Sequence, residues 1–114
     1  MTPTIELCKQ LIERPSVTPD DIQVTRLDCE DVENILITIG DEGPLLIFLG
    51  HTDVVPTGPE SQWRYPPFEP TEEGDLLYGR GTADMKGSIA AFITATERFL
   101  GSKPSLKARF GILL

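Results

Sequence analysis

A run of five consecutive apolar residues, Leu45 to Leu49, ends abruptly at Gly50-His51. A membrane-spanning helix needs roughly 20 apolar residues, so this run is far too short to cross a bilayer. Its length and its continuous apolar character are typical of a β-strand that is buried on both faces of a sheet. The segment therefore predicts a sheet-centred fold with other elements packed over the sheet.

A second pattern places this strand in a βαβ unit. Five side chains at helical spacing, four of them apolar, predict one face of a helix that starts near Lys86 and is ended by Gly101 and Pro104; they are Ile89, Phe92, Ile93, Thr96 and Leu100. Residues 106–114 then resume as a strand. Because a strand, a crossover helix and a second strand form a right-handed unit, we expect strands 45–49 and 106–114 to be parallel.

Three further segments complete the expected fold. Helical spacing follows Pro3 and stops at Pro15, while residues 22–27 and 32–39 are β-branched and aliphatic and predict two more strands. The fold class is therefore α/β, with a mixed, largely parallel sheet that carries helices on its faces. A chain of 114 residues has room for one such core.

The charge balance limits the partners of the chain. Eighteen acidic and ten basic residues give a formal net charge of −8, whereas nucleic acids and anionic membranes require a clustered positive field. We therefore expect neither as a partner. Glu6, Lys9 and Gln10 interrupt any apolar stretch at the N-terminus, which does not resemble a secretory signal, so the expected location is the cytoplasm.

The first candidate site follows the buried strand directly. Ligands of open α/β sheets bind at the carboxyl ends of the strands, where this chain carries His51 and Asp53. Imidazole is a common zinc ligand, and a nearby carboxylate can accept its second ring N–H. A lone histidine in a loop is more often an ordinary polar residue, so this pattern by itself leaves both interpretations open.

The second candidate is Asp84, just before the predicted helix. One interpretation is a helix N-cap, whose carboxylate accepts main-chain N–H bonds at the positive end of the dipole. The other is a carboxylate ligand that bridges two cations, with glycines nearby that allow close backbone approach. Arg80 and Lys86 either meet substrate carboxylates or buttress this loop. Trp63 and its aromatic neighbours form either a substrate wall or the packing that closes a long loop.

Residues 50–58 and 78–87 together resemble the two metal-binding signatures of the dizinc amidohydrolase and aminoacylase family, in the same order and at the family's spacing. The likeness also includes residues 11–20 and 63–70. It implies a zinc-exopeptidase-like catalytic domain, of which residues 1–114 are the N-terminal portion without the lid and dimerisation domain. It further implies two zinc ions, with cobalt as the other possible metal. His51 would bind one ion, Asp84 would bridge both, and Asp53 would hold the His51 imidazole.

The resemblance implies hydrolysis of the amide of a small N-succinyl amino acid by a full-length homodimer. It also implies a cis peptide after Asp84. The family's paired catalytic glutamates follow the strand that corresponds to residues 109–114, so we expect this polypeptide alone to be incomplete and inactive. Two alternatives stay open: a deacylase of the acetylornithine deacetylase or aminoacylase type, and a non-catalytic remnant that acts as a binding module.

Overall fold

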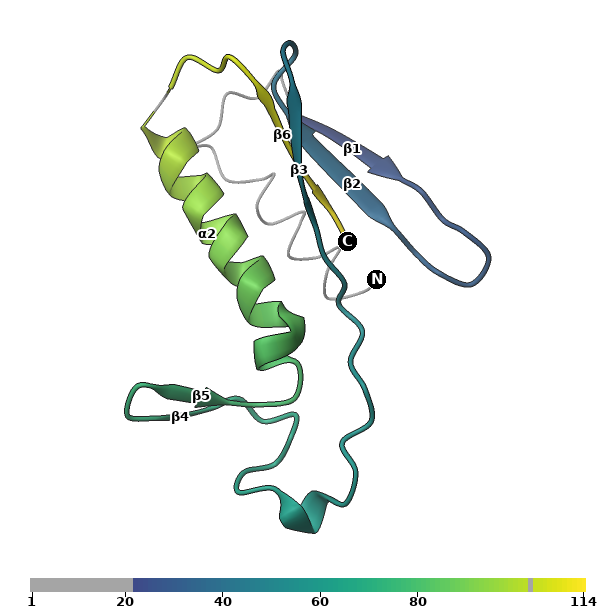
Figure 1. The fold of residues 1–114 in the computed structure, drawn as a ribbon, viewed down its shortest axis with the longest axis vertical. Coiled ribbons are helices and arrows are strands. Elements are labelled where there is room, and N and C mark those ends of the chain that lie inside the picture. Colours follow the sequence, from purple (N-terminus) through teal and green to yellow (C-terminus); the bar gives the residue numbers. More distant parts are fainter. Residues whose placement is uncertain (1–21, 103) are drawn as a thin grey trace. The chain divides into compact units, whose positions relative to one another are not determined.

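The computed structural model describes residues 22–102 and 104–114, so the helix predicted after Pro3 lies outside the described residues. The described residues form two compact units. One unit comprises those up to Gly50 together with Phe92–Leu114, and the other is His51–Ala91. In chain order the elements are β1 (Ile22–Arg26), β2 (Ile35–Ile39), β3 (Leu45–Leu49), the 3₁₀ turn η2 (Glu60–Gln62), β4 (Thr71–Glu73), β5 (Leu76–Tyr78), the π-helical turn η3 (Thr82–Lys86), α2 (Gly87–Gly101) and β6 (Arg109–Leu113) (Figure 1).

The first unit contains a four-stranded sheet in the order β1-β2-β6-β3 (Figure 1). β3 and β6 are parallel, with Leu45 opposite Arg109, which confirms the predicted crossover. The prediction of a largely parallel sheet is wrong for the described strands, because β1 with β2 and β2 with β6 are antiparallel pairs. A short connection joins β1 to β2, and a parallel pair would need a crossover of a dozen or more residues.

β3 differs from its prediction in burial. The strand lies at the edge of the described sheet, and Leu46 and Leu49 are 61% and 69% exposed, so the expectation of burial on both faces is wrong. Phe48 is half-buried and stacks on Phe92 of α2, with ring centroids 4.7 Å apart. Burial of an apolar run requires neighbours on each side, and the described residues give β3 one neighbouring strand.

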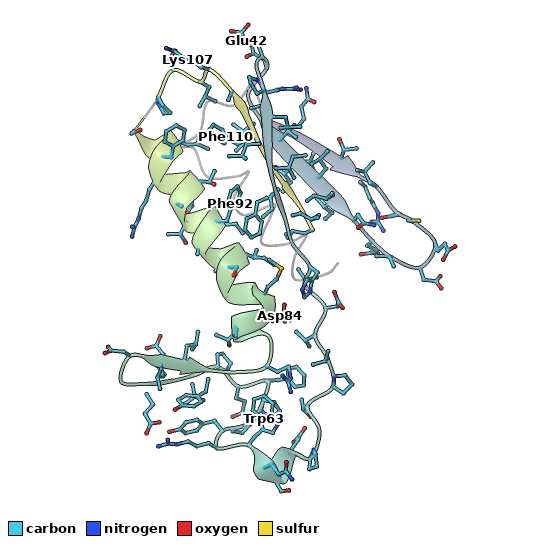
Figure 2. The ribbon with its side chains drawn as sticks, in the orientation of Figure 1. Glu42, Trp63, Asp84, Phe92, Lys107 and Phe110 are labelled. Atoms are coloured by element: carbon cyan, nitrogen blue, oxygen red, sulfur yellow. The ribbon has the colours of Figure 1, made fainter. Side chains whose placement is uncertain are left out.

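The core of this unit forms where β2 and β6 pack near the C-terminal part of α2. Its buried side chains are Ile35, Ile37, Leu100 and Ile112. Ile37 lies directly opposite Ile112 in the antiparallel pair. Phe99 of α2 meets Phe110 of β6 edge to face at 5.6 Å, and Figure 2 shows Phe92 and Phe110 between the helix and the strands. The predicted helix bounds are confirmed, since α2 ends at Gly101.

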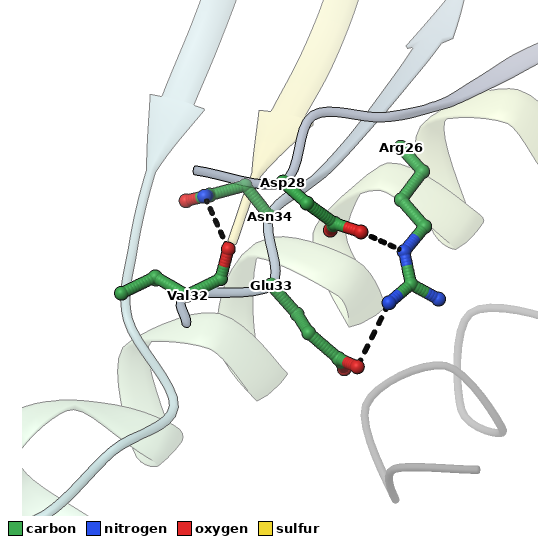
Figure 3. A network of polar contacts seen from close by, with 5 residues as sticks. All are labelled: Arg26, Asp28, Val32, Glu33 and Asn34. Atoms are coloured by element: carbon green, nitrogen blue, oxygen red, sulfur yellow. Dashed lines mark hydrogen bonds and ion pairs between the residues drawn. The ribbon is translucent and has the colours of Figure 1, made fainter. Parts of the chain in front are cut away.

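The β1–β2 connection carries a polar network (Figure 3). The Arg26 guanidinium donates to Asp28 at 2.5 Å and to Glu33 at 2.8 Å, and an isolated bridge pairs Cys29 with Val32. These side chains are exposed, so solvent screens both ion pairs and they contribute little to stability. Residues 27–34 form this turn, which explains why the strand predicted from Val32 begins only at Ile35.

The proline- and glycine-rich sequence predicts a loop from Gly50 to Gly81, and the second unit contains regular structure within that range. β4 and β5 form a two-stranded hairpin with Thr71 opposite Tyr78. The rings of Tyr65 and Tyr78 meet edge to face at 5.2 Å, and Arg64 pairs with Glu73. Within the described residues, no helix has both the length and the apolar character that a bilayer span needs.

Replacing a core residue and an edge residue should separate the two environments in the sheet. We expect Ile112→Ala to lower the free energy of unfolding by about 2–5 kcal/mol, because it leaves a cavity opposite Ile37. Leu46→Ala should cost less than about 1 kcal/mol, since that side chain is largely exposed. Urea unfolding of both variants measures the difference, and equal losses would contradict this assignment of the core.

Candidate metal centre

The structure brings together two of the residues that the sequence singled out. His51 is the first residue of the second unit, and Asp84 lies 33 positions further along the chain in the Thr82–Lys86 turn. The His51 Nε2 and Asp84 Oδ1 atoms are 3.0 Å apart. Asp84 is labelled near the beginning of α2 in Figure 2. The two side chains are 47% and 85% exposed, so the pair is open to solvent.

The position of Asp84 and its side-chain contact differ from those of a helix cap. The residue has an extended conformation, with φ −135° and ψ 93°, and it precedes the first residue of α2 by three positions. Its carboxylate contacts the His51 imidazole. The peptide bond between Asp84 and Met85 is cis, which confirms that expectation.

Asp53 lies on the opposite side of the imidazole. The Nδ1 atom of His51 is 3.1 Å from the main-chain carbonyl oxygen of Asp53 and 3.4 Å from its carboxylate. The shorter contact is therefore to the backbone, and the carboxylate, which is 92% exposed, lies further away. The 3.0 Å contact with the Asp84 carboxylate requires a proton on Nε2, whereas a neutral imidazole with its proton on Nδ1 would leave the Nε2 lone pair for a metal ion.

The surroundings of His51 favour its charged form. The hydrogen bond to the Asp53 carbonyl is the largest effect and raises the pKa of His51 above its ordinary value. Desolvation is the next largest and lowers the pKa, while the negative charges of Asp84 and Asp53 raise it. An imidazolium donates from both nitrogens, which suits acceptors on both sides of the ring.

The donor set suits a zinc ion. An imidazole nitrogen and a carboxylate oxygen both bind zinc at about 2.0–2.2 Å, so two such atoms on a tetrahedral ion lie roughly 3.3 Å apart. The observed separation of 3.0 Å is that of a hydrogen bond between the two side chains and is shorter than the separation on an ion. Among the described residues, no group of three or more His, Cys, Asp or Glu side chains is placed to hold a metal ion. The described residues therefore contain two side chains with the chemistry of zinc ligands but no complete metal site.

Residues 47–114 match the sequence profile of Peptidase family M20/M25/M40. The chain belongs to this family. The match begins within β3 and includes both candidate metal-binding segments as well as α2 and β6. It is a family of metallopeptidases, so a metal ion is part of its chemistry.

Two similar proteins are succinyl-diaminopimelate desuccinylases. The chain is 48% identical over its whole length to that of Methylobacillus flagellatus and 47% identical to that of Halorhodospira halophila. In both alignments this chain spans 34% of the relative's length, which is about a third of each curated protein. The first alignment runs over 129 positions against 114 residues here, so that relative has additional residues within the matched region.

Two solved structures share the fold. Human carnosine dipeptidase 1 superposes on 96% of this chain and 24% of its own, with a TM-score of 0.73 and 24% identity. An M20 family metallo-carboxypeptidase from Sulfolobus solfataricus superposes on 99% of this chain and 30% of its own, with a TM-score of 0.70 and 23% identity. The mixed α/β arrangement is therefore that of M20 peptidase domains.

Sequence reasoning did not pair Arg80 with Trp63. The Arg80 guanidinium lies 4.8 Å from the centre of the Trp63 ring, and the Trp63 Nε1–H donates to the Thr57 carbonyl at 2.9 Å. This supports the packing interpretation of Trp63 and the buttressing interpretation of Arg80. The residues are 17 positions apart, and no periodic spacing links them.

His51 is the only histidine in the sequence, so its imidazole proton signals are unambiguous in an NMR pH titration. We expect a pKa above 6.5 for the metal-free chain, lowered by Asp84→Asn because that change removes a negative charge. The raised pKa stabilises the folded state fully below about pH 6.5, and this contribution is lost as the pH rises through the folded-state pKa. Asp75→Asn on the β4–β5 turn is the control, and an equal effect there would contradict the assignment.

Proposed function

We propose that this chain supplies the N-terminal portion of the catalytic domain of a zinc-dependent succinyl-diaminopimelate desuccinylase. Such an enzyme hydrolyses N-succinyl-LL-2,6-diaminopimelate to succinate and LL-2,6-diaminopimelate, a step of lysine and diaminopimelate biosynthesis. The observation that carries the proposal is the 3.0 Å contact between His51 and Asp84, which joins the two signature segments. Identities of 47–48% over the whole chain support this substrate class.

Each residue has a separate task in the proposed site. His51 would hold one zinc ion through Nε2, and Asp84, with two carboxylate oxygens, would bridge both ions. Asp53 would accept the Nδ1–H bond and so keep the Nε2 lone pair available to the metal. When bound, zinc lowers the pKa of a water molecule to about 7 and polarises the amide carbonyl.

The described residues supply two ligand side chains, whereas a catalytic zinc normally has three protein ligands and a water molecule. We therefore expect residues 1–114 by themselves to bind zinc weakly and to hydrolyse nothing. The general base that passes the water proton to the leaving amine would come from elsewhere in the complete enzyme. A homodimer and a cytoplasmic location stay predictions for that enzyme.

A chimera tests the proposal directly. This chain would replace the matching third of the Methylobacillus flagellatus relative, and hydrolysis of N-succinyl and N-acetyl substrates would be measured with zinc and with cobalt. We expect metal-dependent activity with preference for the N-succinyl substrate. Preference for the N-acetyl substrate would favour the alternative deacylase. Loss of all activity in a folded chimera would favour a non-catalytic binding module.

Substitutions in the active chimera assign the residues. We expect His51→Ala and Asp84→Ala to lower kcat/KM by more than about 100-fold, because each removes a metal ligand. Asp53→Asn should lower it by no more than about tenfold, because the main-chain carbonyl that accepts from Nδ1 remains. Asp75→Asn, on the β4–β5 turn, should stay within about twofold. Zinc content and activity that survive in the His51 and Asp84 variants would show that the ligand assignment is wrong.

A further inference from the structure

Arg80 makes its side-chain contacts away from both candidate ligands. Its guanidinium lies over the Trp63 ring at 4.8 Å, and its Nη2 donates to the Pro56 carbonyl at 3.4 Å. Its Nε is buried and has no hydrogen-bond partner within the described part of the chain. The residue as a whole is half-buried, so its guanidinium is only partly removed from water where it lies over the aromatic face.

Trp63 holds the next residue of the same segment, because its indole N–H donates to the Thr57 carbonyl at 2.9 Å. Arg80 and Trp63 therefore contact each other and bind two successive main-chain carbonyls, at positions 56 and 57. We call these four residues, Pro56, Thr57, Trp63 and Arg80, the arginine clamp.

The backbone around Arg80 is fixed on two sides. The Arg80 N–H donates to the Pro67 carbonyl at 2.6 Å. Gly81 has φ +85°, and a Cβ atom there would lie 2.6 Å from Cγ1 of Val54. The segment that carries Arg80 therefore packs directly against the segment that follows Asp53.

The clamp lies between the two candidate ligands along the chain. Pro56 follows His51 by five positions, and Arg80 precedes Asp84 by four. We propose that the arginine clamp sets the separation of His51 Nε2 and Asp84 Oδ1, and that Arg80 is a positioning residue for the metal centre. The metal part of this inference rests on the proposed function, whereas the positioning of the two side chains does not.

Arginine is required here for a geometric reason. A planar guanidinium can lie over a ring and donate hydrogen bonds within its own plane at the same time, whereas a lysine ammonium presents a point charge. Arg80→Lys therefore keeps the charge and removes the clamp. Arg64 is a matched control, because it lies 5.6 Å from the Tyr65 ring and 5.8 Å from the Tyr78 ring, pairs with Glu73 and belongs to the same unit.

The experiment uses the 114-residue chain and follows the imidazole signals of its only histidine by NMR. First, Asp84→Asn is introduced into four metal-free chains. These are the wild type and the three variants Arg80→Lys, Trp63→Leu and Arg64→Lys. We expect Asp84→Asn to shift the His51 signals in the wild type and in Arg64→Lys, and to have little effect in the two clamp variants. Second, the four chains without Asp84→Asn are titrated with ZnCl₂.

We expect Arg80→Lys and Trp63→Leu each to weaken zinc binding about tenfold, the lower end of the range for outer partners of metal ligands. The double variant should lose little more than either single variant, since both break one contact. Arg64→Lys should stay within about twofold.

Failure of the two proposals gives different results. If the wild type binds no zinc, its two candidate ligands are too few to hold the ion, and the metal-free shifts alone decide the positioning role. The metal centre of the proposed function is then decided separately, by the zinc content of the chimera. If the His51 signals respond equally to Asp84→Asn in all four chains, the clamp does not position the pair and the inference is overturned. Equal weakening of zinc binding by Arg64→Lys and Arg80→Lys also overturns it, because the effect is then a general loss of folding.

Discussion

The parallel pairing of β3 with β6 is the interaction on which the first unit depends. It joins residues that are more than 60 positions apart, and the hydrogen bonds from Arg109 to Pro44 and from Gly50 to Leu113 extend it at both ends. The strands can be parallel only because the chain returns through a long connection and α2. The pairing therefore fixes the point, Gly50, at which the chain leaves the sheet and His51 begins the second unit.

The second unit depends on polar and aromatic contacts more than on a large apolar core. Ile89 is its buried aliphatic residue among those described, while the Arg80–Trp63 contact and the pairing of Tyr65 with Tyr78 connect its loops. A long segment rich in proline and glycine keeps one conformation when such contacts close it. This explains how an irregular segment can present His51 and Asp84 at a defined separation although both side chains are exposed.

The elements with strong periodic signals could be predicted from the sequence. Leu45–Leu49 is a strand with the predicted bounds, α2 ends at the predicted glycine, and the parallel pair follows from the crossover rule. The hairpin β4–β5 could not be predicted in this way, because its strands have three residues each and carry no clear alternation. The prediction that β3 is buried on both faces is wrong for a different reason. A run of apolar residues does not specify how many strands or helices pack against it.

For the candidate site, the sequence by itself determined which residues have metal-binding chemistry, because the identity of each residue gives its imidazole or carboxylate group. The positions of those residues along the chain also give the spacing between the two signature segments. It also determined the family, through a match that extends from residue 47 to residue 114. The tertiary structure decided that His51 meets Asp84, that Nδ1 contacts the backbone of Asp53 more closely than its carboxylate, and that Arg80 lies over Trp63. These are contacts between residues distant in the chain or between particular atoms, and they depend on loop closure in three dimensions, which spacing along a sequence does not specify.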